Sequence, residues 1–292
     1  MNLTHLFHRS LSEDLYVLLG KMTAEIMKNR NDGNGIQSYE FKVFSQFGDD
    51  GIIQYLISKM PSIPKKFIEF GVENYTESNT RFLLMNNNWS GLVMDGDKEN
   101  IKFIRNDHIY WKYALQARCE FITKENINSI IKSEKFDGEI GILSIDIDGN
   151  DYWIWKAIQG VNPWIVIVEY NSVFGSKKSI TIPYLKNFMR TNAHSSNLYW
   201  GTSLGALIDL GISKGYAFIG CNNAGNNAYF IRKDLMKKRF RALSLQEGYV
   251  ESKFRESRDT RGKLTFIRGS ERLLQIKNLP VYNTKTDKIE KL

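Results

Sequence analysis

Two short apolar segments, each carrying an acid near its end, constrain the fold of this chain most. Residues 67–80 run from an apolar strand with Glu69 through a turn at Gly71 into a helix. Residues 91–97 contain a second strand that ends at Asp95. Such a layout binds a nucleoside at the carboxyl edge of a parallel sheet. We therefore expect a ligand that contains a nucleoside.

Strands and helices alternate along the rest of the chain. Apolar runs predict strands at residues 66–70, 90–95, 109–114, 140–147 and 164–170. Helical spacing predicts helices at residues 51–60, 78–87, 98–106, 126–132, 152–157 and 204–210. Two late strands, 215–220 and 228–232, flank an Asn-rich turn and indicate an antiparallel hairpin. The predicted fold is a doubly wound, mostly parallel α/β sheet of Rossmann-like type with this hairpin at its end.

Three parts are expected along the chain. Residues 1–36 form a helical N-terminal extension that packs on the core or on a second subunit, so a homodimer is possible. Residues 37–240 form the main domain, in which the long irregular segment of residues 172–203 is expected to be a binding loop. Residues 241–292 form a charged C-terminal extension with helical stretches and a disordered end.

Composition and net charge limit the classes of molecule that this chain is expected to bind. The 292-residue chain carries a net charge of +8, which favours anionic partners such as nucleotide-activated sugars and phosphorylated glycans. Its basic residues are dispersed and seldom interleave with aromatic ones, so nucleic acid is not expected. The two cysteines, Cys119 and Cys221, provide neither a disulfide framework nor a metal cluster. With no apolar run of membrane-spanning length and no signal-peptide core, a cytoplasmic location is expected.

The single glycine of the first turn selects the ligand class. A dinucleotide fingerprint needs several glycines for its pyrophosphate, but here only Gly71 is present. S-adenosylmethionine (SAM) carries no phosphate, so one glycine suffices. Glu69 is then expected near the cationic methionine moiety and Asp95 at the ribose hydroxyls. The alternative is that these acids cap helices.

A second acidic motif follows the strand at 140–147. Asp146 and Asp148 alternate with apolar residues, so both face one side if the strand continues through them. Burial beside other acids would raise a carboxyl pKa into the range of a general base. Alternatively, Asp146 with Glu169 and Asn171 forms an all-oxygen site for Mg²⁺. A turn role for Asp148 is a third possibility.

Two further candidates lie outside these motifs. Gln46 belongs to a polar segment, residues 45–51, that either caps the next helix or lines the cofactor pocket from above. His194 lies in the irregular segment, where a histidine base for a sugar hydroxyl is plausible and a surface role is the alternative.

With these motifs in view, the chain resembles the FkbM-like methyltransferases, which are class I SAM-dependent enzymes. The resemblance covers about residues 40–232 and rests on Glu69–Gly71, Asp95, residues 145–149 and residues 168–171. It implies that the residues of the first turn, with Asn74 and Thr80, contact SAM. It implies that residues 116–121, with Gln116 and Phe121, lie by the adenine. It also implies that Asp146 and Asp148 face the methyl-transfer site, although Asp148 replaces the Glu typical of the family.

The leading hypothesis is a SAM-dependent O-methyltransferase. Its expected acceptor is a sugar hydroxyl on a nucleotide-activated sugar or a surface-polysaccharide (capsule) precursor, and a carboxylate or His194 would remove the proton. One alternative is a glycosyltransferase that holds a metal at Asp146 and Asp148. Another is a non-catalytic module that binds glycan or RNA.

Overall fold

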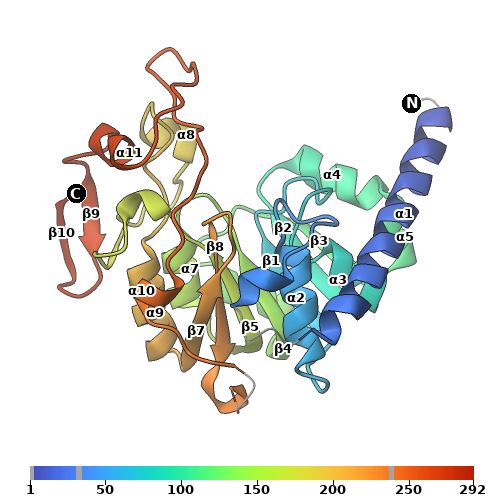
Figure 1. The fold of residues 1–292 in the computed structure, drawn as a ribbon. Helices are drawn as coiled ribbons and strands as arrows, with labels where there is room; N and C mark the ends of the chain where they lie inside the picture. The colour runs from blue at the N-terminus through green and yellow to red at the C-terminus, as the bar shows by residue number, and fades with distance from the viewer. Residues whose placement is uncertain (1–2, 31–34, 237–239) are drawn as a thin grey trace.

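A seven-stranded sheet forms the centre of the protein in this computed structural model, which describes residues 3–30, 35–236 and 240–292 (Figure 1). Its strand order is β3-β2-β1-β4-β5-β8-β7. The first five pair in parallel, and β8 runs antiparallel to both of its neighbours. The strands are β1 (Lys66–Phe70), β2 (Ser90–Asp95), β3 (Leu115–Cys119), β4 (Gly138–Ile145), β5 (Val161–Glu169), β7 (Tyr216–Cys221) and β8 (Asn227–Arg232). The predicted doubly wound, mostly parallel α/β fold with a late antiparallel hairpin is confirmed.

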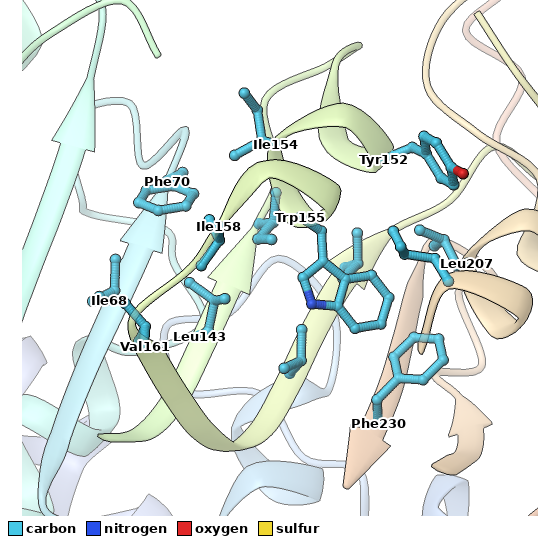
Figure 2. Close-up of a cluster of buried hydrophobic side chains, with 14 of the residues drawn as sticks. Ile68, Phe70, Leu143, Tyr152, Ile154, Trp155, Ile158, Val161, Leu207 and Phe230 are labelled. Atoms are coloured by element: carbon cyan, nitrogen blue, oxygen red, sulfur yellow. The ribbon is translucent and has the colours of Figure 1, made fainter. Parts of the chain in front are cut away.

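Helices cover both faces of this sheet. Because side chains alternate along a strand, Phe67 enters one hydrophobic cluster and Ile68 enters the cluster on the other face. Figure 2 shows the second cluster, in which Trp155 packs on Phe230 with ring centroids 4.9 Å apart. The helices are α2 (Asp49–Ser58), α3 (Arg81–Asn87), α4 (Lys98–Asn106), α5 (His108–Lys112), α6 (Ile127–Ser133), α7 (Asp151–Ala157) and α9 (Leu204–Ser213).

The predicted strand at residues 109–114 is wrong. Residues 108–112 form the short helix α5, and the strand starts at Leu115. The Asp107 side chain accepts a hydrogen bond from the Ile109 amide and so caps this helix. In the true strand Leu115 and Ala117 are buried while Gln116 and Arg118 are exposed, which is the alternation of a half-covered edge strand.

The predicted N-terminal helix is present as α1 (Leu3–Lys28). It packs closely at Gly20, where a Cβ atom would lie 2.5 Å from Val43 Cγ2. The buried Glu13 pairs with the buried Arg81 at 3.2 Å. The opposite face of α1 exposes Leu15, Leu18, Leu19, Met22 and Ile26. The possible homodimer stays a prediction, and this face is where we would seek it.

The C-terminal part is ordered, contrary to the expected disordered end. The strands β6 (Ile180–Thr181), β9 (Pro280–Asn283) and β10 (Lys288–Lys291) form a second sheet in the order β10-β9-β6. Its Ile180 and Val281 pack with Ile276 in a third hydrophobic cluster. Few apolar residues mark these strands, so their pairing with the irregular segment was not visible in the sequence.

Short helices complete the structure. They are η1 (Ile36–Tyr39), η2 (Ser172–Phe174), α8 (Arg190–Ala193), η3 (Lys233–Leu235), α10 (Leu245–Gly248) and α11 (Ser270–Gln275). The segment between α10 and α11 rises past α8 (Figure 1). Among the described helices, none combines the length and apolar character that crossing a membrane requires.

Candidate functional site

A cleft of about 1480 Å³ lies at the carboxyl ends of the parallel strands. Ligand pockets usually measure about 300–1,000 Å³, so this cleft has room for two ligands. We call one side the strand-edge half; its walls come from residues 69–73, 77–79, 94–98, 120–122, 146–150 and 169. We call the other the arm half; its walls come from residues 188–191, 197 and 200 and from the cleft arm, residues 250–268.

Glu69 stands at the end of β1 and is 4% exposed. Its carboxylate accepts hydrogen bonds from the amides of Asn79 (2.8 Å) and Thr80 (3.1 Å). Burial raises the pKa of Glu69 to about 7, and these hydrogen bonds oppose the rise. The side chain therefore caps the start of α3, as the alternative prediction had it, and also lines the cleft.

Gly71 permits a close contact between two of the cleft loops. Its φ is +72°, and a Cβ atom at this position would lie 1.5 Å from the Asp146 carbonyl oxygen. No other residue fits without a shift of that backbone. The glycine is thus needed for packing the first turn on the loop after β4, which positions Asp146.

Asp95 ends β2 and holds the neighbouring turns in place. One carboxylate oxygen accepts from the Glu73 amide and the other from the Asp97 amide, both at 2.8 Å. The side chain is half-buried and lines the cleft, and the exposed ring of Phe121 lies on the same wall. A carboxylate has about four acceptor positions, so a ribose hydroxyl can still donate to Asp95.

The other predicted cofactor contacts divide into two groups. Gln46 lines the cleft. Asn74, Thr80 and Gln116 are outside its wall: Asn74 accepts from the Thr76 amide, Thr80 is fully buried behind Glu69, and Gln116 points outward from the middle of β3. Their predicted role as direct contacts has no support in this geometry.

Three carboxylates gather beneath the strand-edge half. Atoms of Asp146, Asp151 and Glu169 all lie within 4.8 Å of one another. Burial, and then repulsion from neighbouring acids, raises the pKa of both Asp146 and Glu169 well above the usual range. Asp151 accepts from the Ile147 and Gly149 amides, each at 2.9 Å, and burial raises its pKa to about 7. Asp151 thus shapes the loop that carries Asp146.

The other two predicted catalytic residues occupy different settings. Asp148 has a φ of +54° and is exposed, and its carboxylate binds Arg190 at 2.8 Å. In the alternative glycosyltransferase, Asp148 would be the second acid that holds the metal ion, but its carboxylate is already paired with Arg190. His194 binds the Ser196 hydroxyl through Nδ1 at 2.8 Å and is not part of the cleft wall.

The structure brings together two of the three predicted metal ligands, Asp146 and Glu169, with Asp151 as the third acid of the group. The Asn171 amide oxygen accepts from the Val173 amide at 3.0 Å, and its nitrogen donates to the carbonyls of Leu198 and Trp200. Asn171 is therefore used in fixing the backbone and is not in the acid cluster with Asp146 and Glu169. We derive no step through a metal ion.

Sequence reasoning missed most of the arm half. Phe254 of the cleft arm stacks on Phe47 with ring centroids 5.0 Å apart, and Arg190 pairs with Glu256 of the same arm. The buried Asp50 was also missed: one of its oxygens accepts from the amides of three successive residues, 43–45. The local signal for the arm was its excess of basic residues, six against three acids over residues 250–268.

Comparison with known proteins gives structural matches alone, since no family model and no curated protein matches the chain. One match is the N-terminal domain of EvdMO1 with SAH bound (TM-score 0.42, 10% identity, 64% of this chain and 80% of that chain). The same domain in the presence of SAH and D-fucose has a TM-score of 0.40 at 10% identity, covering 73% and 93%. An O-methyltransferase from Bacillus cereus in complex with SAH has a TM-score of 0.42 at 11% identity, covering 74% and 89%. At TM-scores of 0.40–0.42 and identities of 10–11%, these matches show neither a family nor an activity for this chain.

Proposed function

We propose that this protein is a SAM-dependent O-methyltransferase that acts on a sugar hydroxyl. The observation that carries the proposal is the meeting of Glu69, Asp95, Asp146 and Glu169, from four neighbouring strands, in one cleft at the carboxyl edge of the sheet. A nucleoside with a cationic end matches this set, because Asp95 lies where a ribose is expected and the buried acids surround the adjoining space.

The acidic residues that line the strand-edge half support SAM, which carries a cationic end, as its ligand. Asp95 would accept from the ribose hydroxyls, and Phe121 would cover the adenine. Glu69, which is buried and forms no ion pair with any described residue, would gain a favourable charge from the methionine moiety. When bound, SAM supplies an electrophilic methyl group.

The Asp146–Glu169 pair is the proposed general base. The two carboxyls lie within 4.8 Å of each other, so ionisation of one disfavours ionisation of the other and raises the pKa of the pair. Within the described residues, Glu169 Oε2 is buried and has no hydrogen-bond partner, so it offers a free acceptor position. An acceptor hydroxyl beside the pair would pass its proton to the ionised member as its oxygen gains the methyl group. Alignment in a closed cleft would supply most of the remaining rate.

The acceptor would be a nucleotide-activated sugar or a polysaccharide precursor such as a capsule unit. The net charge of +8 supports an anionic acceptor. The test is to incubate the protein with SAM and a panel of free, phosphorylated and nucleotide-linked sugars and to search for methylated products by mass spectrometry. Methylation of at least one charged sugar is expected. Turnover of a nucleotide-sugar without SAM would instead support glycosyl transfer.

A further inference from the structure

The cleft arm, residues 250–268, carries an excess of positive charge over the cleft. It contains six basic residues and three acids: Lys253, Arg255, Arg258, Arg261, Lys263, Arg268, Glu251, Glu256 and Asp259. Of the six basic residues, Arg255 and Arg258 line the cleft. The opposite wall is strongly acidic. The arm therefore divides the cleft into an acidic side and a basic side.

The acids of the arm are already engaged elsewhere. Glu251 pairs with Arg272 at 2.9 Å, Glu256 pairs with Arg190, and Asp259 accepts from the amides of its own turn at 2.8 and 2.9 Å. In the described part of the chain, no carboxylate forms an ion pair with Arg255 or Arg258. Two guanidinium groups facing a cleft without a carboxylate partner are suited to bind an anion.

The arm is held in a defined position. Ser252 binds Ser172 through both its amide (2.9 Å) and its hydroxyl (2.6 Å). A Cβ atom on Gly225 would lie 2.7 Å from the Ser252 amide nitrogen, so the arm begins in close contact with the hairpin turn. Farther along, the Arg258 amide donates to the Ser196 carbonyl at 3.2 Å. The two arginines are therefore fixed relative to the catalytic acids.

Apolar side chains, two of them aromatic, line the cleft beside these arginines. The Arg255 guanidinium lies 5.6 Å from the centroid of the Phe266 ring, and Phe254, Leu264 and Phe266 all line the cleft. Phosphate binds guanidinium groups in a bidentate manner, and sugar or base faces pack on aromatic rings. Both features needed for a phosphorylated sugar thus occur together on the arm.

We propose that Arg255 and Arg258 form a subsite for a phosphate group attached to the acceptor sugar. This inference rests on the proposed function, and it assigns acceptor recognition to the C-terminal extension in addition to the irregular segment. The phosphate could belong to a sugar 1-phosphate or to a nucleoside diphosphate sugar; both share the recognised group.

Titration calorimetry with glucose, glucose 1-phosphate and UDP-glucose tests the subsite. The wild type should bind the two phosphorylated probes more tightly than glucose. The Arg255→Gln/Arg258→Gln variant should lose at least about tenfold in affinity for them, because a hydrogen bond to a charged group is worth about 1.5–3 kcal/mol. A preference for UDP-glucose over glucose 1-phosphate would identify the nucleotide form, and equal binding the simple phosphate.

Matched variants distinguish binding at Arg255 and Arg258 from a general attraction of anions to the positive charge of the arm. Arg261→Gln/Arg268→Gln removes two charges from the same arm outside the cleft wall and should change affinity less than about twofold, as for surface substitutions. Arg255→Lys/Arg258→Gln should recover part of the affinity that the double Gln variant loses, since a charge is restored. The Arg258 side chain also donates a hydrogen bond to the Gly262 carbonyl, and both variants that carry Arg258→Gln lose it. A difference in affinity between these two variants therefore reports the charge at position 255 and excludes loss of arm structure as the cause.

Three results would overturn the subsite. They are equal affinity for glucose and glucose 1-phosphate, equal losses in the two double Gln variants, and tighter, steeply salt-dependent binding of a short single-stranded RNA. SAH is titrated in parallel with every variant. If SAH fails to bind while the phosphate probes behave as predicted, the methyltransferase proposal fails and the anion site stands.

Discussion

The two halves of the cleft are built in different ways. In the strand-edge half, Glu69, Asp95 and Glu169 each stand at or next to the end of a strand, and hydrogen-bonded pairing of the strands brings them together. In the arm half, Arg190 begins the short helix α8 and Arg255 lies on the cleft arm, and side-chain contacts join these segments to distant parts of the chain. The first half is fixed by the sheet and the second by the packing of distant segments. We infer that the strand-edge half serves the cofactor and the arm half serves the acceptor.

Removal of one carboxyl of the proposed base pair should have the largest effect and should leave both binding sites intact. Asp146→Asn keeps the size of the side chain but cannot take a proton. Methyl transfer to the acceptor found in the panel should fall by about 10²–10⁴-fold. SAH and glucose 1-phosphate affinities, measured by calorimetry, should stay within a few-fold.

The matched control for this variant is Glu77→Gln, which neutralises an exposed acid on the same cleft wall. Its rate should change little. Equal rates for Asp146→Asn and the wild type would remove Asp146 from the chemistry and leave the strand-edge half as a binding site only.

Gly71→Ala should break the strand-edge half selectively. The new Cβ atom would meet the Asp146 carbonyl at 1.5 Å, so the loop after β4 must move. Overpacking and a strained φ together should cost about 3 kcal/mol in the free energy of unfolding and weaken SAH binding. Chemical denaturation and calorimetry measure the two effects.

Gly160→Ala supplies the control for that experiment. Gly160 has a similar φ of +73° but nothing within 4 Å of the added Cβ atom. It should therefore cost only about 1 kcal/mol, with SAH binding unchanged. Equal losses of stability in the two alanine variants would show that Gly71 is needed because of its backbone conformation. The close contact with the Asp146 carbonyl would then not explain the need for Gly71.

The strand-edge half should also make stability depend on pH. The folded pKa of Glu69 is about 7 against an ordinary value of 4.5, so the folded state binds this proton more tightly than the unfolded state. Stability should therefore fall as pH rises from 4.5 to about 7, by about 3 kcal/mol from this group. Asp151, at about 7, acts in the same direction.

Glu69→Gln isolates that contribution. The amide loses some hydrogen bonding at every pH, so the variant should be less stable than the wild type at pH 4, and the difference should shrink or reverse by pH 8. Urea denaturation at several pH values measures it. A difference that stays constant with pH would contradict the raised pKa.

His194→Gln should have the smallest effect, because this side chain binds Ser196 and does not line the cleft. The rate of methyl transfer should change by less than about threefold, as for substitutions away from a functional site. Ser196→Ala is the companion variant, since it removes the same hydrogen bond from the other side. A large loss in His194→Gln alone would place the base in the arm half and reverse the roles assigned here.

The contrast between the two halves of the cleft also explains which features could be predicted from the sequence. Strands β1 and β2 and helix α4 begin and end where their apolar patterns predicted, because local periodicity follows burial. Glu69 and Asp95 line the cleft as expected, because strand ends meet at one sheet edge. Thr80 and Gln116 lie outside its wall, because motif spacing does not tell which way a side chain points.

The remaining features depend on contacts between distant segments. Asn171 resembles a metal ligand in the sequence, but its amide is taken up by the carbonyls of Leu198 and Trp200. Arg255 resembles a solvated surface charge until the arm is seen to lie along the cleft. No local pattern reports such packing, so the sequence pointed to the irregular segment of residues 172–203 but not to the arm across the cleft.

The most direct test of the central claim is calorimetric titration of SAH into the wild type and into Asp95→Ala. The wild type should bind SAH with one site per chain. Asp95→Ala should bind at least about tenfold more weakly, because a charged acceptor for the ribose is lost. Absence of binding to the wild type at millimolar SAH, or equal affinity in the two proteins, would contradict the assignment of the strand-edge half to the cofactor.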